Sequence, residues 1–124
     1  MSNELRNDLI ASCKSVAEEL EGYAYGNLIY CENEGGFIDK TDDVEDDGLG
    51  AWLSYVLDIR VTTDLSGNDL YGARVCVACG GPNIYVNTCD GCVEGYWGTE
   101  HVSVELSGSA CEVINDLISE YRGC

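Results

Sequence analysis

Four cysteines form two closely spaced pairs in the second half of the chain. Each pair has the pattern CxxC, and nine residues separate Cys76 and Cys79 from Cys89 and Cys92. Four thiolates bind zinc tetrahedrally, and a two-residue spacer lets each pair hold one side of the metal. The pattern therefore predicts a structural zinc site.

A second interpretation of these four residues needs no cofactor. The spacer Val77-Ala78 is typical of a strand, and residues three apart on an extended strand face opposite sides of it. Asp90-Gly91 is a strong signal for a tight hairpin turn, because both central positions of that turn favour positive φ. On this interpretation the cysteines are free thiols that behave as small apolar side chains.

Carboxylates form the second group of chemically informative residues. Residues 41–50 read TDDVEDDGLG, with no basic residue among them. The run holds five acids: Asp42, Asp43, Glu45, Asp46 and Asp47. Three more acids precede it: Glu32, Glu34 and Asp39. The segment from position 43 imitates the start of a calcium loop, but its twelfth position, which should be a bidentate glutamate, is Ser54. An EF-hand is therefore not expected.

The whole chain is strongly acidic. Its 124 residues include 23 Asp and Glu against 6 Lys and Arg, which gives a formal net charge of -17. This charge would repel phosphates, so nucleic acid is not expected as a direct partner. We expect a basic protein as the partner instead. Solubility or a salt-rich habitat would also explain this composition.

Little in the sequence indicates catalysis. His101 is the only histidine, and it lies beside Glu100 in a predicted strand. No GxSxG motif, P-loop or dinucleotide fingerprint occurs. We therefore expect a protein that is not an enzyme, and keep a small enzyme with a carboxylate site as an alternative.

A helix is predicted at each end of the chain. Apolar residues at spacings of three and four predict the first over residues 3–21. Ser2 or Asn3 would cap its start, and Gly22 would end it. The second is predicted over residues 110–122.

A capping box of Ser109 and Glu112 would begin this C-terminal helix, and Gly123 would end it.

Strands are predicted between the helices, where β-branched and aromatic residues are frequent. Residues 23–31 would form a strand interrupted by Gly26, residues 32–50 an acidic connection, and residues 51–64 a long strand. Short strands follow in RVCVACGG, PNIYVNT, CVEGYWG and HVSVELS.

This order predicts one α+β domain over residues 1–124. We expect an antiparallel β-sheet of four to six strands, with the N-terminal and C-terminal helices packed on one face. The first residues lack the basic start and apolar run of a signal peptide, and no segment has the roughly 18 apolar residues of a membrane span. A cytoplasmic protein without a membrane partner is therefore expected. Its helical stripes leave room for a homodimer.

The charge density is comparable with that of nucleic acid. A compact domain of this length is about 35 Å across. Duplex DNA of that length carries roughly 20 negative charges, against the net -17 of this chain. We therefore expect the domain to imitate the nucleic-acid backbone in front of a basic channel.

In length, charge, and its acidic stretch from Glu32 to Asp47, the chain resembles small inhibitors made by phages and mobile elements, the anti-CRISPR and antirestriction proteins. The resemblance is one of type and involves no shared motif. It implies a viral or plasmid origin, with a CRISPR effector or a restriction enzyme as the target. The alternative is a zinc-stabilised interaction module that binds a basic protein such as a histone or a ribosomal protein.

The eight acids at positions 32–47 are the predicted partner-binding residues. Exposed acids on the sheet or its turns would extend their surface: Asp64, Asp69, Glu94 and Glu100. Reversing four acids to lysine is expected to abolish binding without unfolding the domain: Asp42, Asp43, Asp46 and Asp47.

Overall fold

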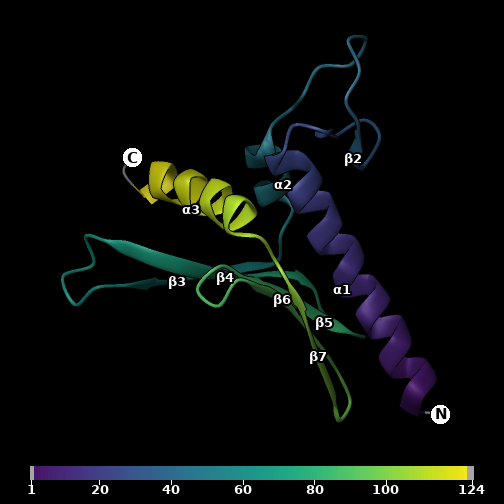
Figure 1. Ribbon diagram of the computed structural model, residues 1–124. Coiled ribbons are helices and arrows are strands. Elements are labelled where there is room, and N and C mark those ends of the chain that lie inside the picture. The colour runs from purple at the N-terminus through teal and green to yellow at the C-terminus, as the bar shows by residue number, and fades with distance from the viewer. Residues whose placement is uncertain (1, 123–124) are drawn as a thin grey trace.

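Five consecutive antiparallel strands form the main sheet, in the spatial order β3-β4-β5-β6-β7. A separate hairpin, β1-β2, precedes it in the chain. The computed structural model describes residues 2–122 and has the α+β fold predicted from the sequence (Figure 1). The elements are α1 Ser2–Ala24, β1 Leu28–Cys31, β2 Gly36–Asp39, α2 Leu49–Ser54, β3 Asp58–Thr63, β4 Leu70–Ala78, β5 Asn83–Asn87, β6 Cys92–Trp97, β7 Glu100–Glu105 and α3 Gly108–Arg122.

The cross-strand register separates an apolar face of the sheet from a polar one. One row that crosses all five strands is apolar: Ile59, Val75, Val86, Val93 and Val104. The adjacent row is mostly polar: Asp58, Cys76, Tyr85, Glu94 and Ser103. Because neighbouring residues of a strand point to opposite faces, the first row faces the core and the second faces away from it.

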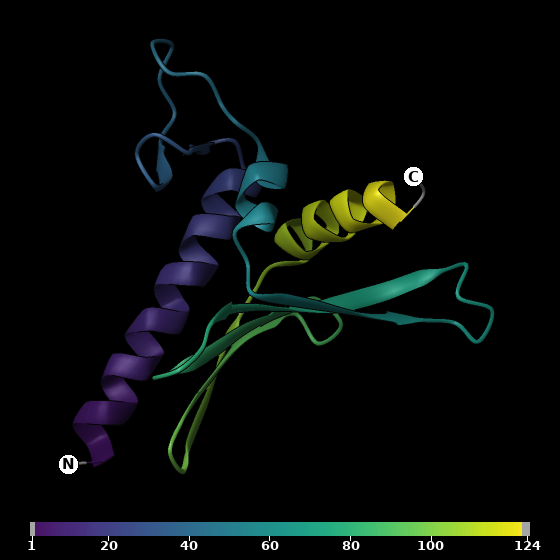
Figure 2. The ribbon, with the colours of Figure 1, turned by 180° about the vertical axis from the view of Figure 1, so that it is seen from behind.

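The two long helices cover the apolar face. Figures 1 and 2 show α1 and α3 on the same side of the main sheet, and α1 contacts β6 and β7 while α3 contacts β4. The close approach of α1 depends on Gly95. A Cβ at that position would lie 2.6 Å from the Cys13 sulfur and 2.9 Å from a Leu9 methyl carbon. None of the helices in residues 2–122 has the length and apolar character required to cross a membrane.

The predicted boundary of the first helix was wrong. α1 continues through Gly22 to Ala24, and the strand that was predicted over residues 23–31 begins only at Leu28. A Cβ at Gly22 would lie 2.5 Å from a Leu28 side-chain carbon, so this glycine provides room for the returning chain instead of ending the helix. The turn comes at Gly26, whose φ is 82°. The side chains of the two predicted N-cap residues lie outside the described residues.

The predictions for residues 32–64 also need correction. The long strand predicted over residues 51–64 is divided between a short helix, α2, and β3. Leu49 and Leu53 are buried four residues apart, which is the spacing of one helix face, and this packing outweighs the strand propensity of the segment. The acidic connection predicted over residues 32–50 contains a strand, β2.

The hairpin turn predicted at Asp90-Gly91 was correct in place but not in length. Asp90 and Gly91 lie in the β5-β6 hairpin, but Asn87 pairs with Cys92, so the connection has four residues instead of two. Gly91 has a φ of 69°, whereas the described non-glycine residues, Asp90 included, have no positive φ.

The C-terminal helix begins at Gly108, and the Ser107 hydroxyl accepts a hydrogen bond from the Ala110 amide at 3.2 Å. Ser107 is therefore the N-cap, and Ser109 is already helical. The predicted end of this helix at Gly123 lies outside the described residues.

Candidate functional site

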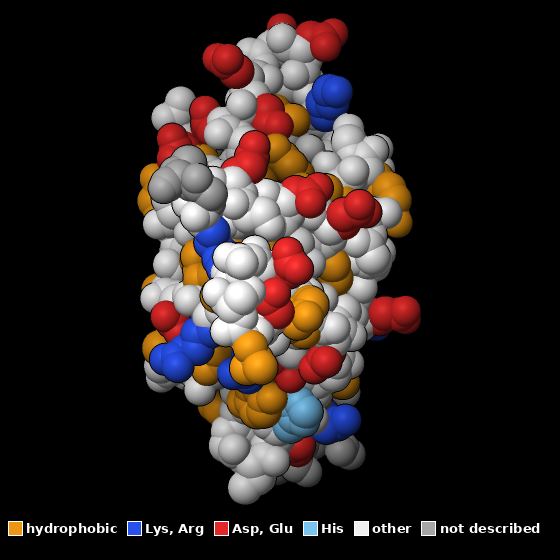
Figure 3. Space-filling model, turned by 90° about the vertical axis from the view of Figure 1, so that its left-hand side faces the viewer, with side chains coloured by type: hydrophobic (Ala, Val, Ile, Leu, Met, Phe, Trp, Pro, Cys, Tyr) orange, Lys and Arg blue, Asp and Glu red, His pale blue; other side chains and the backbone are white. Residues whose placement is uncertain are grey.

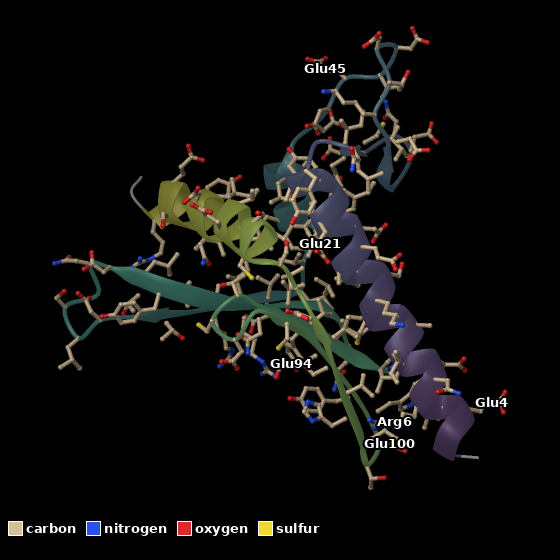
Figure 4. All side chains as sticks on the ribbon, in the orientation of Figure 1. Glu4, Arg6, Glu21, Glu45, Glu94 and Glu100 are labelled. Carbon is tan, nitrogen blue, oxygen red and sulfur yellow. The ribbon has the colours of Figure 1, made fainter. Side chains whose placement is uncertain are left out.

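The eight predicted partner-binding acids lie together on one projecting segment. This segment, residues 32–47, is called the acidic arm here. It extends beyond the C-terminal end of α1, with Glu45 near its tip (Figures 1 and 4). All eight carboxylate residues are exposed, and Lys40 is the only basic residue among them.

An aromatic cluster fixes the base of the acidic arm. The Phe37 ring of β2 lies 5.1 Å from the Tyr30 ring and 6.0 Å from the Tyr23 ring, centroid to centroid, and both contacts are edge-on. Trp52 of α2 lies 6.5 Å from the same phenylalanine. Aromatic pairs at such distances are favourable beyond the area that they bury. The arm is therefore attached to α1 and α2 by packing and does not hang on two free strands.

Asp46 forms part of this attachment. Its Oδ1 atom accepts hydrogen bonds from the Tyr30 amide at 3.1 Å and the Gly48 amide at 2.8 Å, and its Oδ2 accepts one from the Tyr23 hydroxyl at 3.1 Å. Burial, together with this nearby carboxylate, raises the pKa of Tyr23. The same phenol oxygen accepts a hydrogen bond from the Leu49 amide at 3.1 Å. Asp46 thus connects α1, β1 and the start of α2.

Asp47 and Glu32 are also connected within the protein. The Asp47 carboxylate accepts a hydrogen bond from the Glu32 amide at 2.8 Å, and the Tyr55 hydroxyl donates to the Glu32 carboxylate at 3.3 Å. Reversing Asp46 and Asp47 to lysine would break contacts of the fold. The fourfold reversal is therefore not expected to leave the domain folded. Only acids without such contacts can be reversed without loss of stability.

Five carboxylates of the acidic arm remain free of such contacts. Within residues 2–122 their oxygens accept no hydrogen bond and form no ion pair with a lysine or arginine. These free arm acids are Glu34, Asp39, Asp42, Asp43 and Glu45. They can approach a partner without first losing an interaction of the fold.

The four further acids predicted on the sheet and its turns are not gathered with the acidic arm. Glu94 bonds Arg74 at 3.1 Å, and Glu100 pairs with Arg6 at 3.6 Å; Figure 4 places both glutamates in the lower half of the molecule, far from Glu45.

Asp64 stabilises the β3-β4 turn, in which Asp69 also lies, by accepting hydrogen bonds from Ser66 and from the Asn68 and Asp69 amides. The Ser66 hydrogen bond is the main reason that the pKa of Asp64 is lowered.

The uncovered face of the sheet carries a cluster that the sequence did not reveal. The Arg74 guanidinium lies 3.7 Å from the centroid of the Tyr85 ring while it bonds Glu94. Arg60 is the cross-strand neighbour of Arg74 and bonds Asp58 at 2.8 Å.

A cavity of about 440 Å³ is bordered by both arginines, Asp58 and Tyr85. In Figure 3, blue and pale blue side chains lie beside orange ones in the lower part of the face, at the height of the sheet. The alternation of residues along each strand could have predicted that these residues share one face. It could not have predicted the order of the strands, which brings them together.

The four predicted zinc ligands have different surroundings. Cys76 is buried, Cys79 and Cys89 are exposed, and Cys92 is intermediate. Cys76 and Cys92 belong to different cross-strand rows, since Cys76 pairs with Tyr85 and Cys92 with Asn87.

Burial is the main cause that raises the pKa of the Cys111 thiol in α3, and the charges of Cys92 and Cys89 add to it. Among residues 2–122, no group of three or more Cys, His, Asp or Glu side chains is arranged to hold a metal ion. Zinc binding stays a prediction.

His101 is stacked on Tyr96, with 4.5 Å between ring centroids and 10° between planes. This contact gives the ring a packing role on the sheet face.

No family model, curated protein or solved structure matches the chain.

Proposed function

We propose that the protein binds a basic, nucleic-acid-handling protein through the acidic arm and blocks that partner's nucleic-acid channel by imitating the phosphate backbone. The observation that carries this proposal is a projection that is anchored at its base and bears five exposed, unpartnered carboxylates. Anchoring the base limits the conformational freedom that the arm must lose on binding, so more of the electrostatic attraction remains as affinity.

A second set of acids extends the charge along α1. Glu4, Asp8 and Glu18 are exposed and lie on one face of the helix. They span roughly 21 Å at the helical rise per residue. They add to the negative charge of the arm, although Lys14, between Asp8 and Glu18, is an exposed cation of the same helix. Binding this charge to a basic channel would release counterions and depend steeply on salt.

Two arguments support the proposed class of target: the positive charge of channels that hold nucleic acid, and the resemblance of this chain to small acidic inhibitors. A channel that holds nucleic acid is lined by lysine and arginine, and a body with a net charge of -17 is attracted to it over long range. The resemblance to anti-CRISPR and antirestriction proteins favours a CRISPR effector or a restriction enzyme of bacteria. In this function the protein acts by occupancy and needs no catalytic group or cofactor.

The test is affinity capture from a bacterial lysate at low salt, with elution by a salt gradient and identification of the captured proteins. Duplex DNA and RNA are added as competitors. We expect a nucleic-acid-handling protein that is displaced by salt and by its own nucleic acid.

A triple variant removes the charge that carries the proposal. Asp42→Lys, Asp43→Lys and Glu45→Lys together change only free arm acids, and should reduce affinity for the captured target by at least about a hundredfold at low salt. The matched control reverses Glu105, Glu112 and Asp116, which are exposed acids on β7 and α3. Equal losses in both triple variants would show that net charge alone acts. Binding that is indifferent to salt would exclude mimicry of the phosphate backbone.

A further inference from the structure

The two edges of the main sheet differ in how they are covered. At the β7 edge, Arg6 of α1 donates a hydrogen bond to the His101 carbonyl at 3.2 Å and pairs with Glu100. At the other edge, β3 has β4 as its only strand neighbour in the described part of the chain. The β3-β4 hairpin extends past α3, on the opposite side of the molecule from the acidic arm (Figure 1). Half of the β3 backbone groups therefore point away from β4 and can pair with another strand.

The open edge is also apolar on one face. Leu57, Ile59 and Val61 are 60%, 38% and 43% exposed. Ile59 borders a cavity of about 410 Å³ next to Leu53 and Tyr121, so Ile59 and Val61, two residues on, face the helix layer. Leu57, which precedes β3, borders the 440 Å³ cavity of the uncovered face instead. Long, exposed apolar edge strands are sites where another strand pairs.

The residues between them bear opposite charges and face the other way. Asp58 and Arg60 lie on the uncovered face, where they bond each other at 2.8 Å and border the 440 Å³ cavity. Arg60 also lies directly across from Arg74. Like charges at opposed positions destabilise a sheet, so a further carboxylate beside this pair would be favourable.

This sequence is complementary to itself when it is read antiparallel about its centre. If Ile59 is placed opposite its own copy, Asp58 falls opposite Arg60 of the copy, and Arg60 opposite Asp58. In this register both charged pairs are complementary. A register shifted by two residues would lose both charge pairs.

We propose that a second copy of this chain docks on β3, so that the two β3 strands pair antiparallel about Ile59 and join the two sheets into one. The two-fold axis passes through the sheet at that pair, which places both helix layers on the same side. Each Arg60 lies between its own Asp58 and that of the other copy. Apolar contact of Ile59 with its copy and new backbone hydrogen bonds supply the attraction, and the dimer does not depend on the proposed target.

The salt dependence of this contact is opposite to that of the proposed target binding. Two copies each carry a net charge of -17, so their long-range repulsion opposes assembly and salt screens it. We therefore expect the dimer to become tighter as salt increases, while binding to a basic partner weakens. A failure of one proposal can accordingly be distinguished from a failure of the other.

Sedimentation equilibrium of the full chain over a range of concentrations tests the proposal. The wild type should show a monomer–dimer equilibrium. Asp58→Arg alone places two arginines opposite two arginines, and Arg60→Asp alone places aspartates opposite aspartates. Each should weaken dimerisation by about tenfold or more. A mixture of the two single variants restores complementary charges and should form the heterodimer.

The control substitution is Glu105→Arg on β7, which changes the net charge as Asp58→Arg does. It should leave the dimer intact or strengthen it by lowering the repulsion. Circular dichroism verifies that all variants are folded. A wild type that is monomeric at every concentration in high salt would overturn the proposal. So would equal behaviour of Asp58→Arg and Glu105→Arg, or a mixture of folded single variants that does not associate.

Discussion

Asp46 offers the most direct test of the separation between structural and free acids in the acidic arm. Asp46→Ala removes the acceptor of three hydrogen bonds, from the Tyr30 amide, the Gly48 amide and the Tyr23 hydroxyl. Asp43→Ala removes the same charge three positions earlier in the arm, without removing a contact of the carboxylate. If both acids were only surface charges, the two variants would have the same stability.

The expected difference follows from the surroundings of the three donors. The Tyr30 amide is partly buried, so leaving it without an acceptor costs about 1–3 kcal/mol. The Gly48 amide and the Tyr23 hydroxyl lie near solvent and can bond water, which limits their loss to about 0.5–1 kcal/mol each. We therefore expect Asp46→Ala to lower the free energy of unfolding by about 2–5 kcal/mol. Asp43→Ala should change it by less than about 0.5 kcal/mol.

Urea unfolding, followed by tryptophan fluorescence and far-ultraviolet circular dichroism, measures these values. Trp52 contacts Phe37 at the base of the arm, so its emission also reports local release. Asp46→Asn is the matched control, because it removes the charge but keeps an oxygen for the two amides. It should lose less than about 1 kcal/mol. Equal stability of Asp46→Ala and Asp43→Ala would refute the reasoning, as would a loss in Asp46→Asn as large as that in Asp46→Ala.

Two further predictions concern the contact of α1 with the sheet and the burial of a carboxylate. Gly95→Ala places a methyl group against Cys13 and should lower stability by about 1–3 kcal/mol. The control is Gly81→Ala, whose added methyl group meets no atom within 4 Å and should leave stability unchanged. Equal effects of the two substitutions would contradict the close packing of α1 on the sheet. Burial raises the pKa of Glu19. Protonation of Glu19 therefore stabilises the folded chain. This contribution is complete below the pKa that Glu19 has in the unfolded chain, and it is lost as pH rises through the pKa that it has in the folded chain. Glu19→Gln should exceed wild type in stability at pH 7 and lose this advantage below about pH 4, as thermal unfolding at several pH values would show.

The fold class was accessible from sequence because it depends on local patterns. The apolar stripes of residues 3–21 and 110–122 predicted α1 and α3, and strand-like segments between them predicted the antiparallel sheet. Local patterns failed where tertiary packing decided. Gly22 could have ended a helix, but it lies inside α1 because Leu28 returns against it. Residues 51–54 have strand-like composition, but they are helical because Leu49 and Leu53 are buried on one side.

The sequence predicted which segment carries the candidate site. It did not predict which acids of that segment are free and which bond within the protein. The sequence located all eight acids of the arm, and the structure places them on one projection. Which of them are free could not be predicted, because the partners of Asp46 come from α1, β1 and the turn before α2. The short distance from Asp46 to Gly48 in the sequence was the one available signal, since aspartate often bonds the backbone two residues on.

The sequence by itself determined the charge, the alternation of apolar residues and the order of the elements, because these depend only on residue types and their spacing. Tertiary structure alone decided which acids hold the arm, that Arg60 lies across from Arg74, and that β3 is the uncovered edge. Each of these depends on contacts between segments far apart in the chain. Such contacts are set by how the sheet and helices pack, and no local pattern records them.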